Sequence, residues 1–492
     1  MERGSGILMH ISSLPSKHGI GTFGKEARAF VKLLQKAGQK YWQVLPLNPT
    51  SYGDSPYQSF SAFALNPYFV DLDILVKKGY LTKKEVRPIK GGTHPRYVDY
   101  GKIYEERFGI LRLAFQRALP VEKEKWEKFL KKNRFWLEDY ADFMLTKEVF
   151  GGKSWLQWPR PYKFHQRKVI LANREAHMDD FWFWVFVQYH AFDQYTRLRR
   201  YANSKGIQII GDMPIYVAAD SADVWSNPTL FLLDKRRNPA LVAGVPPDYF
   251  SATGQLWGNP IYNWDRMRKN HYRWWKRRVK SMSKLYDCLR IDHFRGFESY
   301  WAVPFGEETA IHGEWKKGPD TEIVDAFRQA AQKLQIIAED LGVITDQVRS
   351  LLSYSGYPGL KVFQFAFGGD PNDPFLPHTY PENCVAYIGT HDNDVFLHFL
   401  EENHKDADAM RRYLNCYGDG HAVLDATLDR LMYSRANVVI FMMQDLLHLG
   451  KEARMNLPGS AVGNWQFRAE KNQLDDRFAR KLYDLAGRAN RL

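Results

Sequence analysis

Residues 288–296, Cys-Leu-Arg-Ile-Asp-His-Phe-Arg-Gly, join a short apolar run to a burst of charge. The first four residues suit a β-strand, and a strand that ends in polar groups is typical of the catalytic rim of a parallel α/β barrel. Arg290 and Asp292 are two residues apart, so on a strand they point the same way. The stretch therefore predicts either a functional Asp292 that a guanidinium keeps ionised, or a structural Arg–Asp pair.

Three further stretches also pass from an apolar run to acidic residues. They are Gln208–Tyr216 with Asp212, Leu334–Gly342 with Glu339 and Asp340, and Val385–Asp394 with His391, Asp392 and Asp394. Because the carboxyl ends of parallel strands meet at one face of a barrel, these side chains are expected to converge there.

Strand-like runs recur along the whole chain, and helical patterns separate several of them. The runs are marked by Met9, Tyr41, Ile209, Leu289, Ile336, Val362, Ala386 and Ile440. Eight such units predict a (β/α)₈ TIM barrel, with residues 1–492 forming a single catalytic unit.

Two long segments do not fit the strand–helix alternation and are predicted to be insertions. Residues 73–204 are rich in Lys and aromatic residues and are expected to be mostly helical. Separate helices are expected at Glu105–Ala118, Lys123–Lys131, Phe135–Phe150 and Asp179–Ala202. Residues 217–280 form the second insertion, which carries a loop at 245–260 with weak helical periodicity and many turn residues.

Two loops have the composition of a ligand-binding surface. Pro49–Pro67 is long for a simple connection, and its Ser55 and Tyr57 are candidate ligand contacts. The 245–260 loop presents the rings of Tyr249, Phe250 and Trp257, which could stack on a sugar polymer. A solvated or hydrophobic packing loop is the alternative in each case.

Composition and charge indicate a globular protein without a nucleic-acid or membrane partner. Hydrophobic residues make up 45% of the chain and charged residues 25%, which suits a packed globular core. The net charge of +13 is spread over helical segments without a nucleic-acid motif, so no nucleic-acid partner is expected. Three separated cysteines and the absence of a signal-like or spanning apolar run predict a cytoplasmic protein with no membrane association.

The three strand-end acids suggest glycoside chemistry. That reaction needs one protonated carboxyl to assist the leaving oxygen and one ionised carboxylate at the anomeric carbon. A third acid can hold sugar hydroxyls and raise its neighbour's pKa. Metal binding is the main alternative, but the spacings of His, Asp and Glu match no metal-site signature, so no metal is expected.

Several longer motifs make the chain similar to a known family. They are His10-Ile-Ser-Ser-Leu-Pro-Ser, the loop at 52–67, Gly211-Asp-Met-Pro-Ile, the loop at 245–260, Arg290–Gly296, Ala338–Gly342, Gly389–Asp394, and Arg454-Met-Asn-Leu-Pro-Gly with Gly463-Asn-Trp. From about residue 4 to 468 they resemble the amylomaltases, the 4-α-glucanotransferases of glycoside hydrolase family 77 in the α-amylase clan.

The resemblance implies roles for individual residues. Asp292 would be the nucleophile, Glu339 the general acid/base and Asp392 the transition-state stabiliser. The implied substrate contacts are Ser55, Tyr57, Asp212, Tyr249, Phe250, Trp257, Arg290, His293, Asp340, His391 and Asn464.

The implied activity is transfer of α-1,4-glucan segments between maltooligosaccharides or starch-type chains, with retention of configuration and release of some glucose. No cofactor is implied, and a monomer or weak homodimer is expected. A hydrolase of the same clan and a non-catalytic glucan-binding protein remain the alternatives. They differ from the transferase in whether a sugar, water or nothing accepts the glycosyl group.

Overall fold

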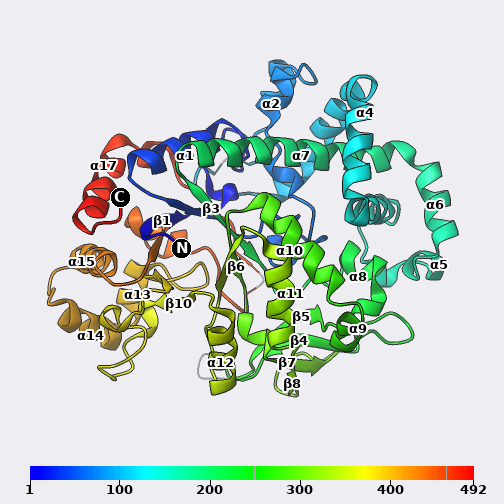
Figure 1. The fold of residues 1–492 in the computed structure, drawn as a ribbon. Helices are drawn as coiled ribbons and strands as arrows, with labels where there is room; N and C mark the ends of the chain where they lie inside the picture. Colours follow the sequence, from blue (N-terminus) through cyan, green and yellow to red (C-terminus); the bar gives the residue numbers. More distant parts are fainter. Residues whose placement is uncertain (93, 248–250, 461) are drawn as a thin grey trace.

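A parallel β-barrel forms the centre of the molecule (Figure 1). The computed structural model describes residues 1–492 except 93, 248–250 and 461. Within that part of the chain eight parallel strands form one sheet, in the order β10-β11-β12-β1-β2-β3-β6-β9. Their bounds are β1 Gly4–Leu8, β2 Tyr41–Gln43, β3 Gln208–Met213, β6 Cys288–Ile291, β9 Gln335–Ala338, β10 Gly359–Val362, β11 Cys384–Tyr387 and β12 Val438–Met442.

The two edge strands of this sheet, β9 and β10, meet and close the barrel. The backbone N–H of Ala338 donates to the carbonyl oxygen of Pro358 at 3.0 Å. Next to it, the Asp340 carboxylate accepts the backbone N–H of Leu360 at 2.7 Å. The predicted (β/α)₈ barrel is therefore confirmed, and its last joint is made partly by a side chain.

The strands lie where the apolar runs predicted them. Seven of the eight marker residues are inside strands, and the eighth, Met9, directly follows β1. Every residue of β11 and β12 is buried. Strands of a barrel are covered by helices outside and by packed side chains inside, which explains why they appear as short continuous apolar runs.

Helices surround the barrel and return the chain from one strand to the next. The connections include α1, α7, α10, α11 and α12, and α13–α15 lead into β12. Their bounds are α1 Lys25–Lys36, α7 Met178–Ser204, α10 Arg273–Leu285, α11 Thr321–Ala331, α12 Asp346–Ser355, α13 Phe396–Glu402, α14 His404–Leu414, α15 Gly420–Met432, α16 Met443–Leu446 and α17 Asp476–Arg488.

The chain between β2 and β3 is helical, and its largest element differs from expectation. One helix, α4 (Tyr100–Val149), covers the region where three separate helices were predicted. It continues through Pro120, so the first two predicted helices are joined. It kinks at Asn133, where φ is −114°, between the predicted helices Lys123–Lys131 and Phe135–Phe150, so that boundary corresponds to a kink rather than a chain break. The other helices here are α2 Leu72–Lys77, α3 Lys83–Val86, α5 Arg160–Lys163 and α6 Arg167–Ala176. None of the described helices is long and apolar enough to cross a membrane.

A second, antiparallel sheet lies beside the barrel and was not predicted. It contains β4 (Leu241–Val245), β5 (Gln255–Pro260), β7 (Ser299–Pro304) and β8 (Glu314–Lys317) in the order β5-β4-β7-β8. Strands β4 and β5 pair with each other and form the β4–β5 hairpin, so both ends of the predicted 245–260 loop belong to paired strands. Two short helices, α8 Ala222–Ser226 and α9 Trp264–Lys269, flank this sheet in the chain.

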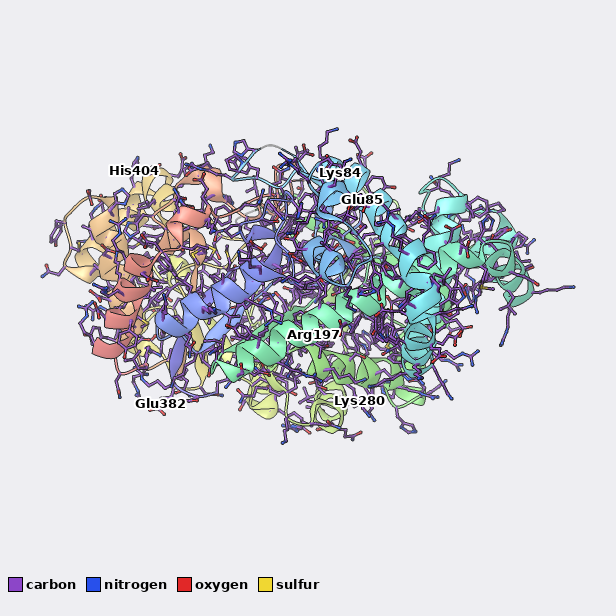
Figure 2. All side chains as sticks on the ribbon, turned by 90° about the horizontal axis from the view of Figure 1, so that it is seen from above. Lys84, Glu85, Arg197, Lys280, Glu382 and His404 are labelled. Atoms are coloured by element: carbon purple, nitrogen blue, oxygen red, sulfur yellow. The ribbon has the colours of Figure 1, made fainter. Side chains whose placement is uncertain are left out.

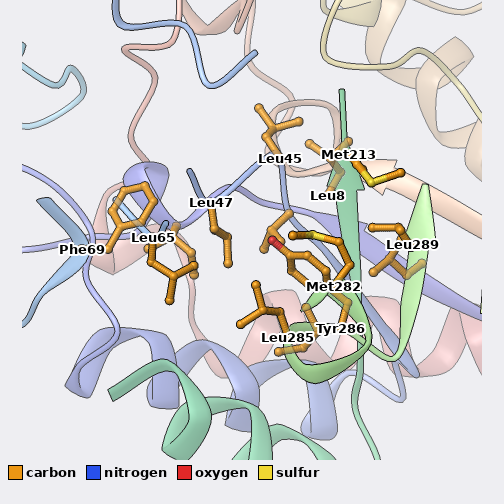
Figure 3. Close-up of a cluster of buried hydrophobic side chains, with 14 of the residues drawn as sticks. Leu8, Leu45, Leu47, Leu65, Phe69, Met213, Met282, Leu285, Tyr286 and Leu289 are labelled. Carbon is orange, nitrogen blue, oxygen red and sulfur yellow. The ribbon is translucent and has the colours of Figure 1, made fainter. Parts of the chain in front are cut away.

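The core is continuous from the barrel strands to the surrounding helices. Figure 3 shows part of it, where Leu8, Met213 and Leu289 come from three strands and Tyr286 follows α10. The ring of Tyr286 packs so closely on β3 that a Cβ added to Gly211 would lie 2.3 Å from the ring. A glycine is therefore required at position 211, because even the smallest side chain would overlap the ring.

Candidate active site

The predicted acids occupy corresponding places on neighbouring strands. Asp212 is the fifth residue of β3, Asp292 directly follows β6, and Glu339 directly follows β9. These strands are adjacent and parallel, and Asp212 is in register with Arg290. All three carboxyl groups therefore face the carboxyl end of the barrel, where β/α barrels place their active sites.

A single guanidinium links these three carboxyl groups. Arg290 Nη1 lies 2.6 Å from Asp212 Oδ2 and 3.1 Å from Asp292 Oδ1. Its other terminal nitrogen, Nη2, lies 3.9 Å from Glu339 Oε2. Arg290 is 3% exposed, so these attractions act with little screening by water. The Arg–Asp pair is thus part of a cluster of acids rather than an isolated strand cap.

Backbone geometry positions Glu339. Its two carboxyl oxygens accept the backbone N–H groups of His293 and Leu341, each at 2.7 Å. His293 has a φ of +49°, and this left-handed conformation comes directly after β6. Burial raises the pKa of Glu339, while Arg290 and the two N–H groups oppose that rise. The net direction is upward, as a proton donor at neutral pH requires.

Asp292 differs from the sequence expectation in its electrostatics. Arg290 lowers its pKa, as predicted, but burial and the neighbouring carboxyl groups of Asp212, Glu339 and Asp392 outweigh that effect. The pKa of Asp292 is therefore raised well above its ordinary value. Glu339 is one of the groups that raise the pKa of Asp292, so the protonation of Asp292 depends on that of its neighbours.

Asp392 lies in the segment after β11, and sequence reasoning selected one of the side chains that hold it, His391, but not the others. Asn456 Nδ2 donates to Asp392 Oδ1 at 2.6 Å, and His391 Nε2 lies 3.3 Å from the same oxygen. Arg454 donates to the Asp392 carbonyl at 3.3 Å and to Asp394 Oδ2 at 3.1 Å. Both Arg454 and Asn456 belong to the Arg454–Gly459 motif, so the motif was a usable signal although its side chains were not assigned.

Tyr57 forms one wall of the site. Its hydroxyl donates to Asp212 Oδ2 at 2.7 Å, and its ring stacks on His391 with 5.2 Å between centroids and 7° between planes. Trp465 packs against both rings. Ser55 lies two residues earlier, where its hydroxyl accepts the backbone N–H of Tyr57 at 3.2 Å. The 49–67 loop therefore delivers Tyr57 to the acids, and the Ser55 hydroxyl supports the backbone at Tyr57.

Strand β5 brings a second aromatic side chain close to the acids. The Trp257 ring meets His293 edge-on, with 4.9 Å between centroids. Burial lowers the pKa of His293 to about 3, so its imidazole is neutral. Gln58 Nε2 donates to the Trp257 carbonyl and to Asn259 Oδ1, both at 3.1 Å. Gln58 was not singled out from the sequence, yet it connects the 49–67 loop to the β4–β5 hairpin.

Some predicted contacts lie elsewhere or outside the described residues. Asp340 bonds to the backbone of β10, as described above. Asn464 exchanges hydrogen bonds with the backbone of Leu457 and donates to Ser460, so its amide orders the 457–464 loop. Tyr249 and Phe250 lie outside the described residues. In the part of the chain that the structure describes, no group of three or more His, Cys, Asp or Glu residues could hold a metal ion.

Comparison with known proteins agrees with this geometry. The family model described as 4-alpha-glucanotransferase matches residues 9–473. The chain belongs to this family, glycoside hydrolase family 77. It is 47% identical over 481 residues to a 4-alpha-glucanotransferase from Clostridium butyricum, covering 97% of this chain and 98% of that one. The Thermus thermophilus 4-alpha-glucanotransferase is 43% identical, with both chains fully covered.

A solved structure extends the similarity to the fold. An amylomaltase from Streptococcus agalactiae, in complex with acarbose, superposes with a TM-score of 0.96 at 41% identity, and each chain is fully covered. The amylomaltase of Corynebacterium glutamicum, at 17% identity and a TM-score of 0.76, supports the fold alone. The enzymatic activity of this chain is accordingly that of a 4-α-glucanotransferase.

Proposed function

We propose that this 4-α-glucanotransferase works by a retaining double displacement through a glycosyl ester on Asp292. The observation that carries the proposal is the Arg290 guanidinium, which contacts Asp292 and Glu339 at the ends of adjacent strands. Retaining glycosidases hold their two carboxyl groups about 5–5.5 Å apart, and we expect that separation here once a glucan is bound.

In the first step Glu339 gives its proton to the glycosidic oxygen while the Asp292 carboxylate attacks the anomeric carbon. The old C–O bond breaks, the leaving glucan departs with the proton, and an ester forms on Asp292. The raised pKa of both groups supports a pair that carries one proton at neutral pH. For productive attack that proton must lie on Glu339, and the 3.1 Å contact of Arg290 with Asp292 favours this distribution.

In the second step the roles reverse. Glu339, now ionised, takes the proton from the 4-hydroxyl of an acceptor glucan, whose oxygen attacks the ester carbon and releases Asp292. Asp392 stabilises the positive charge that develops on the sugar, and Asn456 with His391 hold its carboxylate in place. Tyr57, which contacts Asp212, and Trp257, which contacts His293, have rings suited to stack on sugars.

Transfer rather than hydrolysis requires that an acceptor sugar reaches the ester before water does. Well-oriented groups can reach effective molarities of roughly 10⁵ M, which exceeds the concentration of water. We assign acceptor binding to the β4–β5 hairpin and its residues Tyr249, Phe250 and Trp257. The substrates we propose are α-1,4-glucans and maltooligosaccharides, with some glucose released, and we expect a cytoplasmic monomer.

The ester can be tested by trapping. Glu339→Gln, given an α-maltosyl fluoride that needs no protonation, should form the ester but hydrolyse or transfer it slowly. Mass spectrometry of a peptic digest should then find a maltosyl group on the peptide that contains Asp292. Asp292→Asn is the control and should carry no adduct. A sugar on a different carboxyl, or full activity of Glu339→Gln on maltotriose, would refute the assignment.

Product analysis separates the transferase from a hydrolase. Maltotriose should be converted to glucose and longer oligomers with almost no net gain in reducing ends, because each transfer replaces one glycosidic bond by another. A steady rise in reducing ends would show that water is the main acceptor.

A further inference from the structure

A hollow of about 850 Å³ opens on the outside of the barrel, between α1 and the α2–α3 segment. Figure 2 looks down on this face, where Lys84 and Glu85 mark α3 and Arg197 marks α7. His18, Asp71 and Tyr201 contribute to its lining, and none of the active-site residues described above does. We name it the α1–α3 groove.

Positive charge dominates both walls of the groove. One wall, α1, contributes Lys25, Arg28 and Lys32. The other contributes Lys77, Lys83 and Arg87, and with Lys17 and Lys90 the lining contains eight basic side chains against two acidic ones, Asp71 and Asp73. Eight basic minus two acidic side chains give the lining a formal charge of +6, a large share of the +13 of the whole chain, although the sequence suggested only dispersed helix faces.

Both acids in the groove already have partners. Asp71 accepts hydrogen bonds from Thr22 Oγ1 at 2.7 Å and from the backbone N–H of Ile74 at 2.9 Å. Asp73 pairs with Lys17 at 3.0 Å. Neither carboxylate is left to neutralise the remaining seven basic side chains, and none of these seven forms an ion pair with another described residue.

Three basic residues just outside the groove do have acidic partners. Lys36, also on α1, pairs with Asp476 at 2.7 Å. Lys78, adjacent to Lys77, pairs with Glu122 at 3.4 Å. Arg117 forms a pair with Glu85 of α3 at 2.7 Å. Lys84 of α3 lies outside the groove and also has no ion pair among the described residues, so lack of a partner alone does not set the groove apart. Its distinguishing feature is that seven cations without such a pair line one hollow, where a single bound anion would be attracted by all of them.

We propose that the α1–α3 groove binds a small ligand that carries several phosphate groups. Lys and Arg are the side chains that hold phosphate oxygens, and Arg can do so with two parallel hydrogen bonds. The Arg28 guanidinium lies 4.9 Å from the centroid of the Tyr201 ring, so this stacking holds it at the wall. The volume is within the range of about 300–1,000 Å³ typical of small-molecule sites.

The shape of the site favours a small ligand over a macromolecule. A bilayer surface needs a convex or flat basic face, and a DNA duplex needs a charged track that follows its phosphates. A concave site with cations on facing walls instead suits a compact anion that contacts both walls at once. A nucleoside triphosphate, a sugar bisphosphate and inorganic polyphosphate share this chemistry.

Calorimetric titration of the full-length enzyme with inorganic tripolyphosphate, at about 50 mM salt, tests the proposal. We expect one binding site per chain, with an affinity that falls as salt screens the charges. The triple variant Arg28→Gln/Lys32→Gln/Arg87→Gln should bind at least tenfold more weakly. The control triple Lys128→Gln/Lys131→Gln/Lys132→Gln removes the same charge from exposed α4 and should stay within twofold of wild type.

Parallel titrations with ATP and fructose 1,6-bisphosphate distinguish the sources of phosphate. Tighter binding of either than of tripolyphosphate, lost in the groove triple, supports the proposal and identifies the organic part. Equal binding of all three supports recognition of phosphate alone. Absence of one-to-one binding, or equal weakening in both triples, overturns the proposal. So does binding of a DNA duplex or anionic vesicles that depends on the groove when tripolyphosphate does not bind.

The test does not depend on the catalytic mechanism. Thermal unfolding of both triples, followed by circular dichroism, should match wild type within a few degrees, because the altered side chains are at the surface. Conversion of maltotriose should also remain near the wild-type rate without added phosphate. A failure of the glycosyl-ester assignment would therefore leave the groove proposal intact, and the reverse also holds.

Discussion

Replacing Asn456 by Ala tests how the third acid of the site is held. Asn456 Nδ2 donates to Asp392 Oδ1 at 2.6 Å, and the only other side-chain nitrogen near that oxygen is His391 Nε2 at 3.3 Å, among the residues that the structure describes. The variant removes the shorter contact and leaves the longer one. The Asp392 carboxylate is then free to rotate away from the position in which it faces the sugar.

The magnitude follows from the kind of bond and its exposure. A hydrogen bond to a charged group contributes about 1.5–3 kcal/mol. The Asp392 side chain is 42% exposed, so water partly replaces the lost donor and the lower half of that range, about 1.5–2 kcal/mol, applies. At about 1.4 kcal/mol per factor of ten, kcat should fall roughly 10- to 30-fold. KM should change little, because Asp392 acts mainly on the transition state.

The assay is the initial rate of glucose release from maltotriose over a range of concentrations. Asn383→Ala is the matched control, because Asn383 donates to the Gly356 carbonyl at 3.2 Å on the surface and has no contact with the site among the described residues. It should leave kcat within twofold of wild type. An unchanged kcat for Asn456→Ala, or a loss explained entirely by a lower melting temperature, would refute the reasoning.

Three further results are expected. Burial raises the pKa of Asp292, and in the proposed mechanism this carboxylate must be ionised to attack. The acid limb of the pH profile of kcat/KM should therefore lie above about pH 4, the ordinary pKa of a carboxyl group. A limb at or below about pH 4 would contradict this. Burial raises the pKa of Asp445 from 3.8 to about 7, so the free energy of unfolding should fall as pH rises between these values, and Asp445→Asn should flatten that dependence in denaturant titrations. Gly211→Ala should lower the free energy of unfolding by about 1–3 kcal/mol through overlap with Tyr286. Gly109→Ala, where an added Cβ meets nothing within 4 Å, should be neutral or stabilising.

The barrel could be predicted from the sequence because its strands are buried on both faces. Val438–Met442 is an uninterrupted apolar run. Because both faces of such a strand are buried, no exposed polar residues interrupt the run, and it can be recognised in the sequence. Asp292 and Glu339 could be predicted for a related reason, because an acidic residue directly after a buried apolar run marks the end of a strand. The edge strand β8 of the antiparallel sheet gave no such signal, because it reads Glu-Trp-Lys-Lys, is largely exposed, and has neither an apolar run nor a clean alternation. Strands β4 and β7 contain apolar runs, but no carboxylate directly follows either of them.

Other features depended on contacts that sequence patterns do not contain. Separate helices were predicted at Glu105–Ala118 and Lys123–Lys131, but α4 continues through Pro120 between them. The local preference of proline is overridden by packing, including that of α4 on α7. The pKa of Asp292 depends on burial and on three carboxyl groups from other strands. The donors to Glu339 are backbone groups, which no residue type reveals.

The joint between β9 and β10 has a consequence for heat inactivation. Asp340 closes this joint with its side chain, and Glu339 is the preceding residue. A joint that depends on a partly exposed side chain opens more easily than a continuous ladder of backbone bonds. Opening there would displace Glu339 while the other strands stay paired. On warming, the enzyme should therefore lose the alignment of Glu339, the proton donor in our proposal, and with it activity, several degrees below the temperature at which the barrel unfolds. Amide exchange at Leu360 would report that event directly.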